Sequence, residues 1–243
     1  MTQSFYIKFG KRLFDAVLSM FGLLILSPIL ALVAIAVRLT SPGPAIFRQQ
    51  RTGQFEKPFF ILKFRSMRAA PAGKGTLLTA AGDPRVTPLG HLLRKTKLDE
   101  LPQLWNVLRG DMSLVGPRPE VPVYTALYNP RQKQVLAAKP GITGPSIVLG
   151  EEELLAAHAD KDDFYLSTIL PAKLEIDFAY CQKVEFLSDL KLLFLTFSRL
   201  AGPSRESFSH PQTIRHLVTA RPIDARASEI TVGPPGESAG DTH

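Results

Sequence analysis

Hydrophobic positions are unevenly distributed along this chain, and the densest run lies near its beginning. From Ala16 to Val37, 22 consecutive positions carry no charge. As an α-helix this run would be about 33 Å long. The hydrocarbon core of a bilayer is about 30 Å thick, so the pattern predicts a membrane helix.

Ser27 and Pro28 lie near the middle of this run. Proline removes a backbone N–H and clashes with the preceding turn, so a sharp bend is expected there, with the Ser27 hydroxyl bonded to a freed carbonyl. Basic residues such as Lys8 and Arg38 flank both ends, which would keep both ends cytoplasmic. Asp15 is expected at the membrane interface or paired with a base such as Arg38. These residues leave a re-entrant hairpin and a kinked spanning helix open, whereas the length and the proline disfavour a signal peptide.

The next stretch combines a strand pattern with helix signals. Residues 41–53 read as a turn-rich exit and a short strand, residues 57–68 alternate like a strand that carries Lys63, and residues 69–85 read as a surface loop. Thr87 followed by Pro88 predicts the start of a helix.

A second helix is expected with Asp99 as its N-cap, which places Pro102 in the first turn, where no N–H donor is needed. A start at Thr96 would put this proline inside the helix. Gly110 predicts the end of the helix. Helical spacing predicts one buried face, formed by Leu101, Leu104, Trp105 and Leu108.

Further along, residues 139–145 (KPGITGP) predict either a pocket-lining loop or a plain turn. Residues 171–202 predict a helix with a broad apolar stripe, suited to the core or to a membrane surface, with Asp177 and Tyr180 on its more polar side. The sequence therefore divides into a membrane segment (1–40), a cytoplasmic domain (41–202) and a tail expected to be disordered (203–243).

Charge adds a preference for anionic partners. The net charge is +7, and residues 1–150 carry 20 Lys and Arg against 7 Asp and Glu. Such a balance favours phosphates or an anionic membrane face. We expect no nucleic acid partner, because no basic helix interleaved with aromatics and no zinc-finger spacing is present. Cys181 is the single cysteine, which excludes an internal disulfide, and the five histidines show no metal-ligand spacing.

Asp99 and Glu100 are adjacent carboxylates in a basic stretch that includes Arg94 and Lys97. A helix N-terminus and these bases would favour the ionised form of Asp99. A plain helix cap followed by a solvated acid is the simpler interpretation. Against it, Arg118 stands between two prolines, which fix its backbone and limit the loss of freedom when its guanidinium binds phosphate oxygens.

Several motifs together resemble the bacterial sugar transferases called monotopic phosphoglycosyl transferases. The resemblance runs from about Lys11 to Leu200. The motifs are KRLFDAVLS, the SP of the apolar run, SPGPAIFRQQRTG, KFRSM, LRKTKLDELPQLWNVLRGDMSLVGPRP, KPGITG and LEIDFAYCQK. The fold it implies is α+β and mostly helical, with a re-entrant membrane helix broken at Ser27 and Pro28, packed with a small cytoplasmic catalytic domain and amphipathic interface helices.

The resemblance also implies a function. In this family a sugar 1-phosphate passes from a UDP-sugar to polyprenyl (undecaprenyl) phosphate at the cytoplasmic face of the inner membrane, with release of UMP and initiation of glycan assembly. It implies Asp99 as the nucleophile that carries the phosphosugar, Glu100 as the second acid, and Mg²⁺ held by both. Basic positions of the family that bind phosphate match Lys63, Arg94 and Arg118.

The chain departs from many relatives after KPGITG, where Pro145 to Val148 and three glutamates, Glu151 to Glu153, follow. The sugar, the glycan pathway, the polyprenyl length and the oligomeric state are therefore left open, a homodimer among the possibilities. A non-catalytic membrane-bound scaffold of a glycan pathway is the alternative function.

Overall fold

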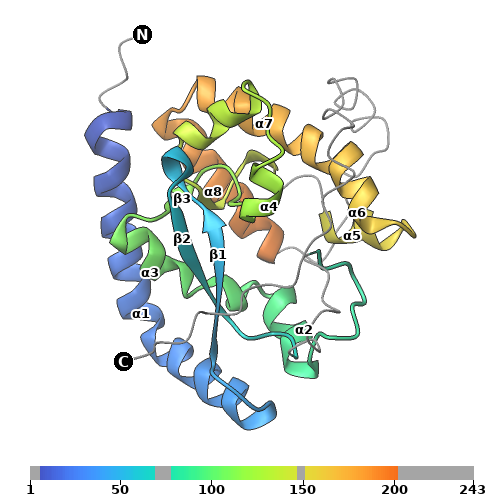
Figure 1. The fold of residues 1–243 in the computed structure, drawn as a ribbon. Helices are drawn as coiled ribbons and strands as arrows, with labels where there is room; N and C mark the ends of the chain where they lie inside the picture. Colours follow the sequence, from blue (N-terminus) through green and yellow to red (C-terminus); the bar gives the residue numbers. More distant parts are fainter. Residues whose placement is uncertain (1–5, 69–77, 147–150, 202–243) are drawn as a thin grey trace, which may run out of the picture.

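The computed structural model describes residues 6–68, 78–146 and 151–201. The expected disordered tail (203–243) and most of the expected surface loop at residues 69–85 lie outside the described residues. Helices and short strands are mixed along the first two thirds of the chain and helices alone follow, with helix predominating (Figure 1). The elements are α1 (Lys11–Thr40), β1 (Ile46–Thr52), β2 (Pro58–Phe64), α2 (Pro88–Lys95), α3 (Gln103–Arg109), β3 (Ser113–Val115), α4 (Pro122–Thr125), β4 (Gly141–Thr143), α5 (Glu151–Ala156), α6 (Lys161–Phe164), α7 (Leu170–Gln182) and α8 (Phe186–Ala201). Short 3₁₀ or π turns cover Tyr6–Gly10, Gln54–Glu56, Leu98–Glu100, Gln132–Ala137 and Tyr165–Ile169.

The apolar run forms α1, one helix of 30 residues with Pro28 inside it. Figure 1 shows α1 descending along one side of the molecule and then turning, so that its last part crosses the bottom. The Ser27 hydroxyl donates to the Leu24 carbonyl at 2.8 Å, which is the acceptor that the missing N–H of Pro28 leaves open. The predicted role of Ser27 is thus confirmed, while the re-entrant path through a membrane stays a prediction.

The first half of α1 is held by the rest of the protein. Arg12 donates to the carbonyls of Val107 and Leu108 at the end of α3, at 2.6 and 2.7 Å. Asp15 is buried and accepts from the backbone N–H of Leu114 at 3.0 Å. The expected pairing of Asp15 with Arg38 is wrong, because one helix places them about six turns apart.

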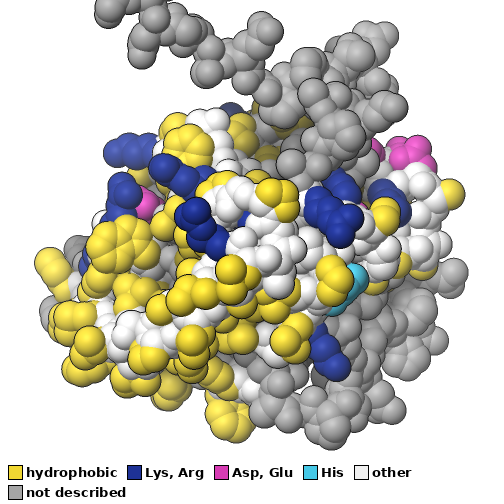
Figure 2. Space-filling model, turned by 90° about the horizontal axis from the view of Figure 1, so that it is seen from below, with side chains coloured by type: hydrophobic (Ala, Val, Ile, Leu, Met, Phe, Trp, Pro, Cys, Tyr) yellow, Lys and Arg dark blue, Asp and Glu magenta, His cyan; other side chains and the backbone are white. Residues whose placement is uncertain are grey.

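Apart from these contacts and a small cluster around the buried Val37, α1 presents apolar side chains outward. Its most apolar 18-residue window has a mean hydropathy of 2.7, and only 6% of that window is buried inside the protein. Figure 2 shows hydrophobic side chains gathered over one side of the face seen from below, with Lys and Arg side chains along their border. This is the length and composition of a membrane helix rather than of a buried core helix.

Two small sheets organise the remainder. β1 and β2 pair antiparallel, with Ile46 opposite Phe64 and Thr52 opposite Pro58, so the predicted strand at 57–68 is confirmed up to Phe64. β3 and β4 pair parallel, with Ser113 opposite Gly141. Residues 139–145 thus contribute a strand where a loop or turn was expected.

Helix α3 packs beside α1, where a Cβ added to Gly22 would lie 3.2 Å from Leu104. The prediction that Trp105 lies on the buried face of this helix is wrong. Its side chain is 49% exposed, whereas Gln103, Asn106 and Val107 are buried. Asn106 is polar but can be buried in that face, because its side-chain amide makes hydrogen bonds to the backbone of β2.

The helix expected over residues 171–202 is divided into α7 and α8. Asp177 and Tyr180 are both buried, so their placement on a polar side is wrong. Tyr180 donates to the buried Asp189 of α8 at 2.6 Å, which ties the two helices together. The apolar stripe of α8 is largely exposed, with Leu187 at 73%, which favours the membrane-surface alternative over the core.

Candidate active site

The turn between α2 and α3 carries the two adjacent carboxylates. Thr87 caps α2 by accepting from the N–H of Gly90, as predicted. After α2 ends, Lys97 adopts a left-handed conformation (φ 56°), and Leu98–Glu100 forms a single 3₁₀ turn. Helix α3 begins only after Pro102, so the prediction that Asp99 is its N-cap is wrong. The predicted end at Gly110 is confirmed, with a φ of 92°.

Asp99 has an environment unlike that of a helix cap. Asp99 is only 5% exposed, and its Oδ1 is buried without a hydrogen-bond partner. Burial and then the charge of Glu100 raise the pKa of Asp99, while Lys63, Lys97 and Arg94 lower it by less. The expected stabilisation of the ionised form is therefore outweighed by desolvation. The result is a carboxyl group with an unused oxygen among bases.

Glu100 is bound by two of the three bases that the resemblance assigned to phosphate. Its Oε1 accepts from Lys63 Nζ at 2.8 Å and from Arg118 Nη2 at 3.1 Å. Burial opposes ionisation, but Lys63, Arg118 and Lys97 together hold the pKa of Glu100 well below its usual value. The pKa of Lys63 is lowered because its burial outweighs its pairing with Glu100. The Arg118 side chain remains 42% exposed, so it can meet a ligand as well.

Arg94 and the proline break lie apart from this cluster. Arg94, in the last turn of α2, donates to Glu152 at 2.6 Å, and its charge is among those that lower the pKa of Asp99. Ser27 and Pro28 belong to α1, where the Ser27 hydroxyl bonds the Leu24 carbonyl and not either of the two carboxylates. The structure thus joins Lys63, Glu100 and Arg118 by direct hydrogen bonds, whereas Arg94 acts on Asp99 only through its charge.

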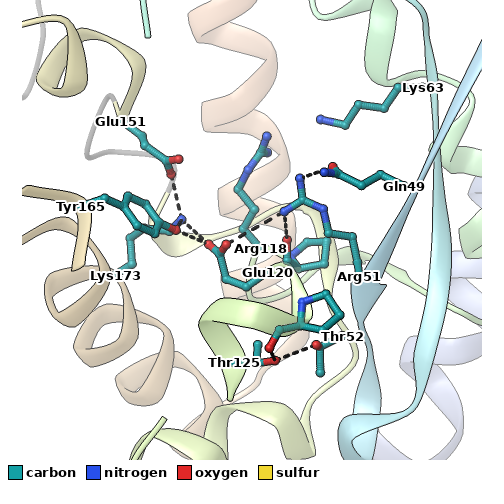
Figure 3. A network of polar contacts seen from close by, with 12 residues as sticks. Gln49, Arg51, Thr52, Lys63, Arg118, Glu120, Thr125, Glu151, Tyr165 and Lys173 are labelled. Atoms are coloured by element: carbon teal, nitrogen blue, oxygen red, sulfur yellow. Dashed lines mark hydrogen bonds and ion pairs between the residues drawn. The ribbon is translucent and has the colours of Figure 1, made fainter. Parts of the chain in front are cut away.

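Behind Arg118 lies a second polar cluster that the sequence did not single out (Figure 3). Lys173 of α7 donates to Glu120 at 2.6 Å, to Glu151 at 2.8 Å and to the hydroxyl of Tyr165 at 3.1 Å. Burial alone would lower the pKa of Lys173, but the two carboxylates raise it. Glu120 directly follows the Pro-Arg-Pro motif, and this position is the feature of the sequence from which the second cluster could have been predicted.

Strand β1 fixes the loop that carries Arg118. Arg51 donates to the carbonyl of Pro119 at 3.1 Å and to Gln49 at 2.7 Å, and the N–H of Thr52 donates to the carbonyl of Glu120 at 2.9 Å. Figure 3 shows the side chains of Arg51, Lys63 and Arg118 directed into the same region. Strand β1 therefore helps the flanking prolines to fix the backbone of the loop from which the Arg118 side chain extends.

Glycines allow the KPGITG segment to approach this loop. A Cβ on Gly141 would lie 2.2 Å from the backbone N of Gly116, and a Cβ on Gly144 would lie 2.1 Å from the Gly116 carbonyl oxygen. Any side chain at these positions would separate the two segments. The contact places Thr143 and Gly144 in a pocket beside Arg118.

The residues present are suited to Mg²⁺ only together with a phosphate ligand. In the described ranges, no group of three or more His, Cys, Asp or Glu side chains could hold a metal ion. Mg²⁺ is commonly bound by one or two carboxylates with substrate phosphates and water. The unpartnered Oδ1 of Asp99 beside Glu100 fits that donor set.

Comparison with known proteins identifies the family of the chain. Residues 6–202 match the family described as bacterial sugar transferase. A UDP-glucose:undecaprenyl-phosphate glucose-1-phosphate transferase of Escherichia coli is 39% identical over 196 residues, which are 76% of this chain and 39% of that protein. The protein of the same name from Caulobacter vibrioides is 39% identical over 193 residues, 78% of this chain and 69% of that protein. A putative undecaprenyl-phosphate N-acetylgalactosaminyl 1-phosphate transferase of Bacillus subtilis is 48% identical over 118 residues, 49% of this chain and 66% of that protein.

The family match covers most of the chain, so the chain belongs to the bacterial sugar transferases, and the resemblance drawn from its motifs is confirmed. The chain spans well under half the length of the Escherichia coli relative and about two thirds of the Caulobacter relative.

Proposed function

We propose that this protein transfers a sugar 1-phosphate from a UDP-sugar to polyprenyl phosphate and releases UMP. The observation that carries the proposal is the buried carboxyl of Asp99, whose Oδ1 has no partner and which lies among Lys63, Lys97 and Arg94. Relatives named as undecaprenyl-phosphate sugar-1-phosphate transferases support the same reaction.

The reaction divides into two displacements at one phosphorus. In the first, an Asp99 oxygen bonds to the phosphorus that bears the sugar, and the bond from this phosphorus to the bridging oxygen breaks, so that UMP leaves with the electron pair. In the second, an oxygen of polyprenyl phosphate bonds to the same phosphorus, and the bond to Asp99 breaks. This route gives polyprenyl diphosphate sugar and restores the carboxylate.

The surrounding charges suit these steps. Arg118 and Lys63 offset the negative charge of the diphosphate as the phosphorus is attacked. The low pKa of Glu100 keeps this carboxylate ionised, so we assign it to holding charge or metal rather than to accepting a proton. Mg²⁺ would be held by Asp99 and Glu100 and would supply further neutralisation of the diphosphate.

We further propose that α1 enters and leaves the cytoplasmic leaflet of the bacterial inner membrane. The support is the bend in an otherwise exposed apolar helix, the basic residues at both ends and the exposed stripe of α8. In this arrangement the catalytic site faces the cytoplasm at headgroup depth, where a polyprenyl phosphate presents its phosphate.

The membrane path is tested with single cysteines in a Cys181→Ser background. Cysteines introduced at Lys8 and Lys57 should both react with a membrane-impermeant maleimide in inside-out vesicles, and neither should react in intact spheroplasts. Labelling of one site from each side would replace the hairpin with a spanning helix.

The reaction is tested with Asp99→Asn in detergent or nanodiscs, supplied with polyprenyl phosphate, Mg²⁺ and a panel of UDP-sugars. UMP release should be abolished, and the phosphosugar adduct that mass spectrometry detects on the Asp99 peptide of the stalled wild-type protein should be absent. The matched control is Asp160→Asn, an exposed N-cap where Asn is equally suited, and it should keep full turnover. Normal turnover of Asp99→Asn would exclude Asp99 as the nucleophile and favour a scaffold.

A further inference from the structure

A second pocket adjoins the candidate active site and shares Arg118 with it. It is open to solvent, and the space between its atoms, counted together with that adjoining solvent, is about 310 Å³. Its lining consists of Arg118, Ile142, Thr143, Gly144, Ser146, Glu151 and Lys173. Because this space includes open solvent, the pocket is a shallow recess that can receive one ring at its mouth and not a whole nucleotide sugar.

Most polar groups of this lining already have partners. The Thr143 hydroxyl bonds to Thr196 at 2.7 Å, and Lys173 is shared by two carboxylates and a tyrosine hydroxyl. Glu151 binds Lys173 through Oε2 alone, and its side chain is 30% exposed. The remaining Oε1 of Glu151 and the exposed guanidinium of Arg118 are therefore the groups of this lining that are left for a ligand.

We propose that this pocket holds the sugar ring of the donor, with Glu151 Oε1 accepting a hydrogen bond from one ring hydroxyl. The assignment rests on the proposed function, because Arg118 lines the pocket and also bonds Glu100, the neighbour of Asp99. A diphosphate bound by Arg118 near Asp99 would carry its attached sugar directly into the adjoining space.

The chemistry of the lining favours a sugar over a nucleobase. The seven residues include no aromatic ring on which uracil could stack. A fixed carboxylate oxygen beside a guanidinium offers an acceptor and donors, which is what a ring bearing several hydroxyls needs. Lys173 fixes the position of Glu151, so discrimination between sugars that differ at one hydroxyl follows from geometry.

Glu151→Gln is the informative variant, because its amide oxygen can still accept from Lys173 while the second oxygen becomes a donor. UMP release is measured with the preferred UDP-sugar and with analogues that each lack one ring hydroxyl. In the wild type, removal of the hydroxyl bound by Glu151 should lower kcat/KM by about tenfold or more. In Glu151→Gln the same removal should cost less than about threefold. Glu175→Gln, an exposed carboxylate paired with Arg131, should leave every ratio unchanged.

An equal fall of kcat/KM for all donors in Glu151→Gln would overturn the assignment. So would a change confined to discrimination between UDP- and dTDP-sugars, which would place the ribose 2′-hydroxyl in the pocket. Absence of turnover in the wild type would refute the proposed function instead. In that case the Kd of each donor would be measured by calorimetry for the wild type and for Glu151→Gln. The assignment is supported if removal of the hydroxyl weakens binding to the wild type and does not weaken binding to the variant.

Discussion

Asp177 provides the sharpest test of the buried electrostatics. This residue of α7 is 3% exposed, and its Oδ1 has no hydrogen-bond partner. Burial raises the pKa of Asp177 from 3.8 to about 7, with Lys173 and Ser146 opposing the shift and Glu120 adding to it. The folded protein therefore binds this proton more tightly than the unfolded chain does.

The sign and size of the effect follow from linkage. The stabilisation by the proton of Asp177 is fully present below about pH 4 and is lost as the pH rises to about 7. One pKa unit corresponds to about 1.4 kcal/mol, so the loss amounts to about 4 kcal/mol above pH 7. Asp177→Asn keeps the shape of the protonated group and removes its titration.

We therefore expect Asp177→Asn to match the wild type in stability near pH 4 and to exceed it by about 4 kcal/mol at pH 8. Urea unfolding in a mild detergent, measured at intervals between these pH values, gives the difference directly. Other shifted groups are common to both proteins and cancel. A difference that does not vary with pH would refute the assignment of a raised pKa to Asp177.

Two further predictions concern other parts of the fold. Trp105 is the single tryptophan and is 49% exposed on α3 beside α1, so its fluorescence should be quenched by brominated lipids in vesicles; unchanged emission would place it outside the bilayer. Lys173→Ala should lower the free energy of unfolding by about 3–5 kcal/mol because it leaves Glu151 without an ion-pair partner and Glu120 with only Arg51, at 3.9 Å. Lys133→Ala, which breaks an exposed pair, should cost under about 1 kcal/mol; equal effects in thermal unfolding would contradict this.

The features that sequence predicted correctly depend on neighbouring residues. Thr87 with Pro88 starts α2, Gly110 ends α3, and the Ser27 hydroxyl bonds the carbonyl that Pro28 leaves open, because capping and proline chemistry act within one turn. The motif around Asp99 and Arg118 likewise identified the family, because its residues are nearly consecutive.

Local rules failed where distant segments decided the outcome. The placement of Trp105 on a buried face was wrong because the packing of α3 against α1 and β2 decides which of its sides is covered. The bases expected to favour the ionised form of Asp99 do lower its pKa, but desolvation, which comes from the whole surrounding fold, exceeds their attraction and raises the pKa overall.

The sequence by itself determined the apolar helix with its proline, the basic character of residues 1–150 and the motif of adjacent carboxylates that identifies the family, since each depends on composition or on local geometry. Only the tertiary structure decided that Lys63, Glu100 and Arg118 meet, and that Lys173 gathers Glu120 and Glu151 behind them. These groups lie far apart along the chain. When the fold buries them together, an unpaired charge is costly, so each group pairs with another. Their pairing is therefore a property of the fold and not of any one segment.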